Sequence, residues 1–439
     1  MSRKALRDEI DRLRREMQQL RIELAETRVL ADSTTIEPFV RRSASAALSA
    51  LRRRMQTLRK GETSRAGTAS AATPYVVRPR GAPAAVRVRV LHVIGNFHLG
   101  GSTRLVVDLI ERLSQKYEHA VATRDLPPTP AYVGLAVEHH TASSLDGAAA
   151  VVGRHRPAFL HVHYLGHHRD KYGARDWEWY RHWFAAAERA GVPVIENINI
   201  PTEPFVSDAV ACYVHVSDYV RERFGRRDGR HLTIHPGSDF SVFTPPSESS
   251  READCLGMVY RLERDKLDER AIEPFIEAVR LRSATRALIV GGGSLLDGFR
   301  RRVADAGMEH AFTFTGYVSY EALPALYGRM SVFVAPVHRE SFGQVTPFAM
   351  GSGLPVVGYD VGAIPEIIGD RALLAPAGDA NRLGALAASL LDDDGRRAVL
   401  GASNRDRAAR LFSVEAMIAA YTPLYAELAA RRPNASHPA

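Results

Sequence analysis

Short apolar runs alternate with amphipathic segments of helical period along residues 86–410, and this alternation limits the folds open to the chain. The first unit reads VRVRVLHVIGNFHLGGSTRLVVDLIERLSQ, which predicts a strand, a glycine turn and a helix. Later runs such as PAFLHVHYLG, VPVIENINI, DCLGMVYRL and SVFVAPV also read as strands. Repeated strand–helix units predict parallel sheets covered by helices on both faces. We therefore expect an α/β fold of two doubly wound domains facing a cleft, with ligands at the carboxyl ends of strands.

Changes in composition divide the chain into five parts. Residues 1–30 are predicted to form a coiled-coil helix, and residues 31–85 a basic amphipathic segment followed by a flexible linker. Residues 86–245 and 246–410 each hold one series of strand–helix units and are predicted to be Rossmann-like domains. Residues 411–439 are predicted to form a helix and a tail, with the helix packed back on the first domain.

The predicted coiled-coil helix repeats apolar residues at alternating steps of four and three. These seam positions, flanked mainly by Glu and Arg, are Leu6, Ile10, Leu13, Met17, Leu20 and Leu24. The pattern favours self-association over a helix lying on the body, and it predicts a homo-oligomer. The stretch RRSASAALSALRRRMQTLRKG predicts a basic amphipathic helix. For this helix, a peripheral contact with an anionic membrane and an ordinary solvated position remain equally open.

The positive charge of the chain is concentrated in this N-terminal extension. Residues 1–90 hold 20 Lys+Arg and 9 Asp+Glu, whereas the remaining residues hold 38 and 41. A nearly neutral body argues against nucleic acid as a partner. No apolar run reaches the roughly 18–20 residues of a membrane-spanning helix, and the first residues are too charged for a secretory signal. Cys212 and Cys255 form no disulfide framework or zinc motif, so we expect a cytoplasmic protein, with a peripheral position on the inner membrane face left open.

Two glycine-rich turns follow predicted strands. At the first, Gly101 precedes Ser102 and Thr103, where exposed amides and the helix dipole favour a phosphate, although glycine there also suits a tight corner. The second, GGG at 291–293, has Leu296 in the third glycine position of a dinucleotide fingerprint and lacks the acid that should follow. Hydride transfer with a dinucleotide cofactor is therefore not expected.

Charged residues follow two predicted strands of the second domain. Arg261 and Lys266 lie after DCLGMVY, and two cations at a strand exit suit a diphosphate. Glu340 follows SVFVAPV and precedes Gly343, a region whose backbone amides can bind the same anion. By itself, such a pair of cations is as often a surface charge cluster as a ligand site. The glutamate loop in the same domain favours a ligand site.

The segment LHVHYLGHHRD contains four histidines within eight residues. His161 and His163 are predicted to point to one face of a strand, and His167 and His168 to lie in the following loop. No carboxylate or cysteine completes a zinc motif, so no metal is predicted. The favoured hypothesis is a histidine that contacts substrate in the cleft.

Taken in order, the motifs of the body resemble those of GT-B-fold retaining glycosyltransferases of the glycogen-synthase-like and phosphatidylinositol-mannosyltransferase-like group (glycosyltransferase family 4 type). The matching stretches run from about residue 88 to residue 425. They are GNFHLGGSTRLVVDL, the His-x-His strand end, VSDYVRERFG, IHPGSDFSVFTP, YRLERDK, VGGGSLLDGF, GYVSYEALPALY and ESFGQVTPFAMGSGLPVVGYDVGAIPEII.

The resemblance implies that the first domain binds an acceptor (a glycan, lipid or protein) and the second a UDP- or GDP-linked sugar donor. His163 and Glu340 would be the catalytic residues, His163 near the reacting carbon and Glu340 at the sugar hydroxyls. Arg261 and Lys266 would hold the donor diphosphate, with no metal or cofactor. The other implied donor-binding positions are Gly101 at the phosphate, Gly316, Tyr317 and Val318 beside the nucleobase, Ser341, Phe342, Gly343 and Gln344 in the sugar and phosphate cradle, and Phe348.

Phe348 departs from the family pattern, which has a second glutamate there to bind the donor ribose. A phenyl ring cannot accept hydrogen bonds from hydroxyls. The leading hypothesis is nonetheless a retaining, metal-independent transferase of bacterial surface polysaccharide, glycolipid or glycoprotein synthesis, because the other donor residues are present. One alternative is a catalytically silent glycosyltransferase-like subunit that scaffolds an active partner. A sugar-nucleotide epimerase on the same fold is less favoured.

Overall fold

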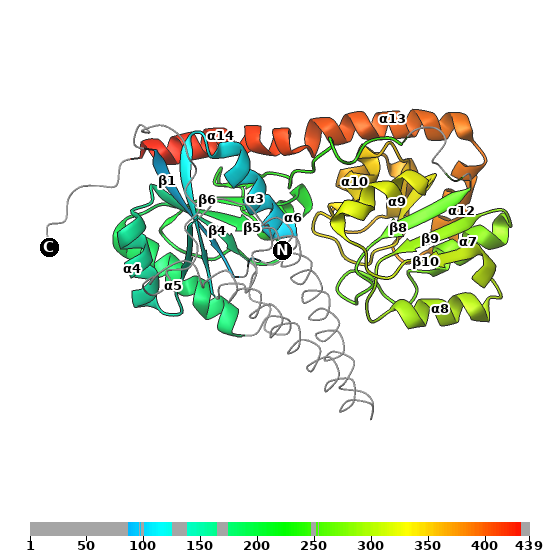
Figure 1. Ribbon diagram of the computed structural model, residues 1–439, viewed down its shortest axis with the longest axis horizontal. Helices are drawn as coiled ribbons and strands as arrows, with labels where there is room; N and C mark the ends of the chain where they lie inside the picture. The colour runs from blue at the N-terminus through cyan, green and yellow to red at the C-terminus, as the bar shows by residue number, and fades with distance from the viewer. Residues whose placement is uncertain are drawn as a thin grey trace, which may run out of the picture. The chain divides into compact units, whose positions relative to one another are not determined.

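The computed structural model describes residues 87–95, 97, 101–124, 138–164, 174–246, 252 and 254–431. The chain divides into two compact units, Met1–Pro74 and Tyr75–Ala439, and the described residues belong to the second. The predicted coiled coil, basic segment and linker lie outside the described residues, as do His167 and His168. Two parallel sheets covered by helices confirm the expected α/β fold (Figure 1).

The first domain is built on a seven-stranded parallel sheet with the order β3-β2-β1-β4-β5-β6-β7. Its strands are β1 (Val88–Ile94), β2 (Tyr117–Thr123), β3 (Glu138–Thr141), β4 (Phe159–Tyr164), β5 (Val194–Ile198), β6 (Val210–His215) and β7 (His231–Thr233). The sheet runs outward in both directions from β1 and β4, which pair directly. This is the order of a doubly wound sheet.

Helices cover both faces of this sheet. They are α3 (Gly101–Leu113), α4 (Leu145–His155), α5 (Ala174–Ala190) and α6 (Asp218–Phe224). Alternate residues of β1 point to opposite faces, so Leu91 and Val93 lie in the core cluster that includes residues of α4 and α5. Val90 lies in a second cluster with residues of α3 and of the C-terminal helix α14 (Val414–Ala430). The first domain therefore takes part of its core from the C-terminal end of the described chain.

The second domain repeats the arrangement with six parallel strands in the order β10-β9-β8-β11-β12-β13. They are β8 (Cys255–Val259), β9 (Arg286–Val290), β10 (Phe312–Phe314), β11 (Val332–Ala335), β12 (Val356–Tyr359) and β13 (Leu374–Ala375). The helices are α7 (Glu273–Leu281), α8 (Leu296–Asp305), α9 (Leu323–Arg329), α10 (Val345–Gly351), α11 (Ile364–Ile368), α12 (Ala380–Leu391) and α13 (Asp394–Leu411), with 3-10 turns at Glu309–Ala311, Tyr320–Ala322 and Arg371–Leu373. Both sheets thus have the doubly wound order.

The chain passes between the two domains twice, and the two connections pair with each other. Ser238 forms a parallel bridge with Ser413, and its amide donates to the Phe412 carbonyl at 2.8 Å. Beyond this bridge, α14 places the Tyr425 hydroxyl 2.8 Å from Nδ1 of His161 in the first sheet. A Cβ on Gly237 would lie 2.6 Å from the Val414 Cα, so only glycine allows this approach.

Each sheet has one point where the strand order reverses, which we call its switch point. The switch point lies between β1 and β4 in the first sheet and between β8 and β11 in the second. Ligands of doubly wound sheets bind at the carboxyl ends of the strands beside such points. In the first sheet, Gly101 follows β1 and His163 lies near the end of β4. In the second sheet, Lys266 follows β8 and Glu340 follows β11. Among the described helices, none combines the length and apolar character needed to cross a bilayer.

Candidate functional site

A partly buried ion pair lies at the switch point of the second sheet. The Lys266 ammonium donates to both carboxylate oxygens of Glu340, at 2.8 and 2.9 Å. Glu340 is 1% exposed, whereas the Lys266 side chain remains 35% exposed. The sequence predicted separate roles for these two residues, and the structure brings them into direct contact. The lysine therefore carries a partly accessible cation that a buried carboxylate holds in place.

Arg261 is the more exposed of the two predicted cations. It follows β8, its side chain is 63% exposed, and its Nη2 donates to Asp265 at 2.8 Å. Guanidinium groups bind phosphate oxygens through fixed donor pairs. Arg261 and Lys266 thus leave the same strand end, but they form ion pairs with different acids.

Residues 340–344 form a tight loop between β11 and α10, which we call the donor loop. Gly343 has a φ of +79°, and a Cβ there would lie 2.6 Å from Oε2 of Glu340. The Ser341 amide donates to Oε1 of Glu340 at 3.0 Å. Glycine is needed at 343 both for the left-handed backbone and for the space beside the carboxylate.

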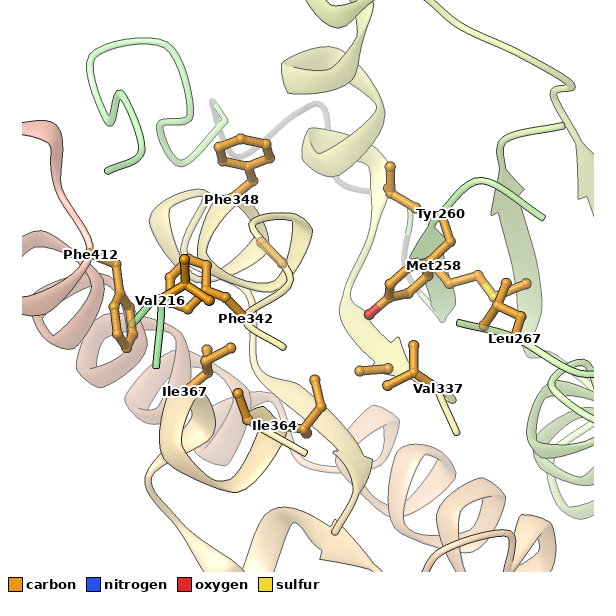
Figure 2. Packing of buried hydrophobic residues seen from close by; sticks show 14 of the residues in the cluster. Val216, Met258, Tyr260, Leu267, Val337, Phe342, Phe348, Ile364, Ile367 and Phe412 are labelled. Carbon is orange, nitrogen blue, oxygen red and sulfur yellow. The ribbon is translucent and has the colours of Figure 1, made fainter. Parts of the chain in front are cut away.

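The ring of Phe342 anchors the donor loop in the core. It is 4% exposed and lies 5.6 Å, edge to face, from the ring of Phe412. Figure 2 shows Phe342 packed near Val216 and Phe412. Phe342 can therefore contribute its backbone amide to a ligand, while its side chain holds the loop.

Gln344 connects the end of the donor loop with the first domain. Its Nε2 donates to the Gly237 carbonyl at 2.9 Å. A Cβ on Gly101 would lie 3.1 Å from its Oε1, so the first turn of α3 approaches the donor loop closely. The structure therefore brings Gly101 and the donor loop together, and a contact of Gly101 with a phosphate stays a prediction.

The residues predicted beside a nucleobase lie in the loop after β10. Gly316 has a φ of +68°, and its carbonyl accepts a hydrogen bond from the Gly291 amide at 3.1 Å. The Tyr317 ring is 54% exposed and lies over Gly292, where a Cβ would approach the ring to 2.6 Å. Val318 is half-buried. The triple glycine thus accommodates this loop, in which the Tyr317 side chain is partly exposed.

Phe348 packs against other aromatic side chains. It lies on α10, is 6% exposed, and stacks on Phe243 with ring centres 4.0 Å apart and planes 7° apart. Tyr320 lies edge to face with it at 6.0 Å. In Figure 2 it extends from α10 away from Phe342. The position that carries an acid in the family pattern is therefore part of an aromatic cluster, and its proximity to a ribose stays a prediction.

His163 is fully buried in the first sheet. Its Nε2 lies 3.3 Å from Nδ1 of His92, whose Nε2 lies 3.0 Å from Nδ1 of His119. Burial lowers the pKa of His163 and of His92 well below the ordinary range, and it lowers that of His119 to about 4. We expected a histidine open to substrate. The described ring contacts a neighbouring imidazole, and its contact with a sugar stays a prediction.

His161 joins the same cluster and points to the same face of β4 as His163, with ring centres 4.2 Å apart. One nitrogen each from His92, His161 and His163 can be chosen so that all three lie within 4.8 Å of one another. Three neutral imidazoles are suitable zinc ligands. The distances among these three imidazoles are compatible with a metal ligand set, and the expectation of no metal stays a prediction.

Glu366 and His235 are contact residues that the sequence reading missed. Glu366 lies in α11, and its carboxylate accepts hydrogen bonds from His235 and from two amides at the start of α6. A proline–glutamate pair at the start of a short helix after a strand, GAIPEII, was the available signal. Nothing local in the sequence identified its partners, which lie more than 130 residues away.

Comparison with known proteins agrees with this geometry. Residues 254–393, which contain β8 to α12, match the family model described as "Glycosyl transferases group 1". The chain is 27% identical over 219 residues to the lipopolysaccharide core biosynthesis mannosyltransferase LpsB of Rhizobium meliloti (strain 1021), covering 46% of this chain and 62% of that protein. It is 28% identical over 225 residues to the GDP-mannose-dependent alpha-(1-6)-phosphatidylinositol monomannoside mannosyltransferase of Mycobacterium tuberculosis (strain CDC 1551 / Oshkosh), covering 46% and 58%. The chain thus spans about three fifths of the length of these two relatives.

A longer match is 28% identical over 395 residues to the D-inositol 3-phosphate glycosyltransferase of Geodermatophilus obscurus, covering 75% of this chain and 86% of that protein. Among solved structures, HepE of Anabaena in complex with UDP has a TM-score of 0.65 at 16% identity, covering 77% of this chain and 100% of that one. At these identities the structural likeness concerns the fold. Residues 254–393 are thus a glycosyl transferases group 1 domain, and the two parallel-sheet domains have the GT-B fold.

Proposed function

We propose that the protein transfers a sugar from a nucleotide-sugar donor to a glycan, lipid or protein acceptor, with retention of anomeric configuration and without a metal. The observation that carries this proposal is the Lys266–Glu340 pair beside the donor loop, at the switch point of the second sheet. Such a position suits an anionic ligand at the strand ends. The pair holds a partly exposed cation where a diphosphate would lie.

The chemistry assigned to these residues is electrostatic. Arg261 and Lys266 bind the diphosphate and stabilise the negative charge that develops as the bond to the sugar breaks. The amides of Phe342, Gly343 and Gln344 add fixed donors, and Glu340 accepts from sugar hydroxyls. Because fixed positive groups neutralise the leaving group, the reaction needs no divalent cation.

The nucleobase is assigned to the partly exposed side chain of Tyr317, because the resemblance places this loop beside the base and any base can stack on an aromatic ring. The named relatives suggest the first donors to test. One is GDP-mannose-dependent, and HepE binds UDP. The aromatic cluster around Phe348 leaves the ribose hydroxyls to other groups. Surface polysaccharide, glycolipid or glycoprotein synthesis is the corresponding biological setting.

Calorimetry with UDP, GDP and their glucose and mannose derivatives, followed by NMR of the product's anomeric proton, tests the proposal. We expect binding of one nucleotide class and a product with the donor's configuration, with turnover unchanged by EDTA. If the full chain binds no nucleoside diphosphate, the enzyme proposal fails. The catalytically silent subunit that scaffolds a partner then remains.

We further propose that the N-terminal extension sets assembly and membrane contact rather than chemistry. The leucine seam and the basic segment of residues 1–60 support this proposal. Deleting residues 1–85 should lower the mass in light scattering and leave nucleotide binding unchanged. Full-length protein should bind anionic vesicles and the deletion should not. An unchanged mass would reject the homo-oligomer, and vesicles left unbound by the full chain would reject the membrane contact.

A further inference from the structure

We infer that Ser217, His235 and Glu366 form an interdomain clamp by which the first domain positions the donor loop. This inference rests on the proposed function, because it assigns the donor loop to the sugar donor. Ser217 belongs to the first domain, is fully buried, and donates from its hydroxyl to the Ser341 carbonyl at 2.6 Å. The hydroxyl also accepts from the Val220 amide at 3.2 Å, so one side chain both caps α6 and holds the donor loop.

The carboxylate of Glu366 makes the second connection, from α11 of the second domain. Its Oε1 accepts from the Asp218 amide at 2.9 Å and its Oε2 from the Tyr219 amide at 3.1 Å. The Glu366 side chain is 18% exposed, which makes these charge-assisted bonds stronger than exposed ones. On the second-domain side, Arg407 donates to the Glu366 carbonyl at 2.7 Å and fixes the backbone of α11. The start of α6 is therefore held by the second domain.

His235 joins the two connections. Its Nε2 lies 2.6 Å from Oε1 of Glu366, and its ring stacks on Phe342 with centres 5.5 Å apart. The edge of Phe412 packs against the same ring at 5.1 Å. The donor loop is thus held from the first domain at Ser341 through a hydrogen bond and at Phe342 through a stacked ring.

These contacts couple the shape of the donor loop to the contact between the domains. The amides of residues 342–344 can bind a donor well only when their directions are fixed. The first domain fixes the donor loop at Ser341, through Ser217, and at Phe342, through His235. A sugar held by Glu340 and these amides must be positioned to within a fraction of an ångström for efficient transfer. Nucleoside diphosphate binding depends chiefly on the cations Arg261 and Lys266, whose ion pairs lie within the second domain and are not part of the clamp. Loss of the clamp should therefore reduce turnover far more than nucleotide affinity.

Two variants remove parts of the clamp, and each has a matched control in the first domain. Glu366→Gln replaces one accepting oxygen by a donor, whereas Glu188→Gln changes a carboxylate that bonds Ser207 and the Asp208 amide within its own domain. Ser217→Ala removes the hydroxyl, Ser217→Thr retains it, and Ser207→Ala is the control for losing a serine hydroxyl. We expect Glu366→Gln and Ser217→Ala to lower kcat at least tenfold with the Kd for UDP or GDP changed less than threefold. Ser217→Thr and both controls should stay within threefold of wild-type kcat.

A distance measurement tests the clamp without activity. Spin labels on cysteines at Val206 and Val399, both strongly exposed, report the separation of the domains, while native Cys212 and Cys255 are buried. Glu366→Gln should broaden the distance distribution and Glu188→Gln should not. A distribution as narrow as that of the wild type, or an unchanged kcat in both clamp variants, would overturn the inference. If no nucleotide binds the wild-type chain, the proposed function fails, and the distance distribution still decides whether the clamp exists.

Discussion

Replacing Phe348 by Glu places a carboxylate where the family pattern has an acid, and the structure predicts loss of stability rather than gain of binding. The ring is 6% exposed and lies flat against Phe243, which is itself fully buried, with Tyr320 at its edge. A glutamate side chain there would direct its carboxylate toward the face of an aromatic ring. The replacement therefore removes a stacked pair and buries a charge among apolar groups.

The expected cost follows from three contributions. Truncating a buried phenylalanine costs about 3–5 kcal/mol, and the methylenes of glutamate recover part of this. The stacked pair contributes about 0.5–1.5 kcal/mol beyond its buried area. Burial of an unpaired carboxylate adds a few kcal/mol, which the group limits by taking up a proton. We expect Phe348→Glu to lower the free energy of unfolding by about 4 kcal/mol, and Phe348→Leu by about 1–2 kcal/mol because leucine retains most of the volume.

Urea denaturation followed by far-UV circular dichroism measures these differences. Phe312→Glu is a matched control, because Phe312 is a half-buried residue at the edge strand β10 and should tolerate the acid at a smaller cost. The reasoning is refuted if Phe348→Glu is as stable as wild type. Stability together with new binding of UDP or GDP would show that the aromatic cluster opens readily onto the ribose site.

Three further predictions concern the donor loop and the buried histidines. Lys266→Met should weaken UDP or GDP binding about tenfold to a hundredfold, because a charge-assisted contact contributes about 1.5–3 kcal/mol. An unchanged Kd in calorimetry would contradict this prediction. Gly343→Ala should destabilise the protein by at least about 1 kcal/mol more than Gly378→Ala in urea denaturation, since both have a left-handed φ but only Gly343 lies against a buried carboxylate; equal losses would reject the clash. Burial lowers the pKa of His119 to about 4, so the unfolded chain binds the extra proton first and stability falls as the pH decreases from about 6.5 toward 4, by up to about 3 kcal/mol. His119→Gln should flatten this dependence of stability on pH, whereas the change His310→Gln at an exposed residue should not. Equal slopes of stability against pH in the two variants would show that His119 is not the source of the effect.

The sequence predicted the sheets and the strand ends well, because the spacing of apolar residues and the alternation of strands with helices can be read from short stretches of the chain. Lys266 and Glu340 were placed at the correct strand ends, yet their mutual contact depends on β8 pairing with β11 across more than 70 residues. The burial of His163 depends on the imidazole of His92 on a neighbouring strand, and that of His161 on helix α14, whose position is set by the whole chain. Phe348 likewise could not be interpreted before its partner Phe243 was known. Side-chain partners brought together by topology leave no local signal.

The position of α14 has a consequence for how the protein is made. The first domain is synthesised early, but the helix that covers Val90 and bonds His161 is encoded after the entire second domain. Domains that fold during synthesis generally do so as the chain emerges, N-terminal first. Here the nascent first domain must wait with part of one apolar face uncovered until residue 430 has left the ribosome. A ribosome stalled between residues 246 and 410 would therefore carry an incomplete first domain, exposed to chaperones for as long as the pause lasts.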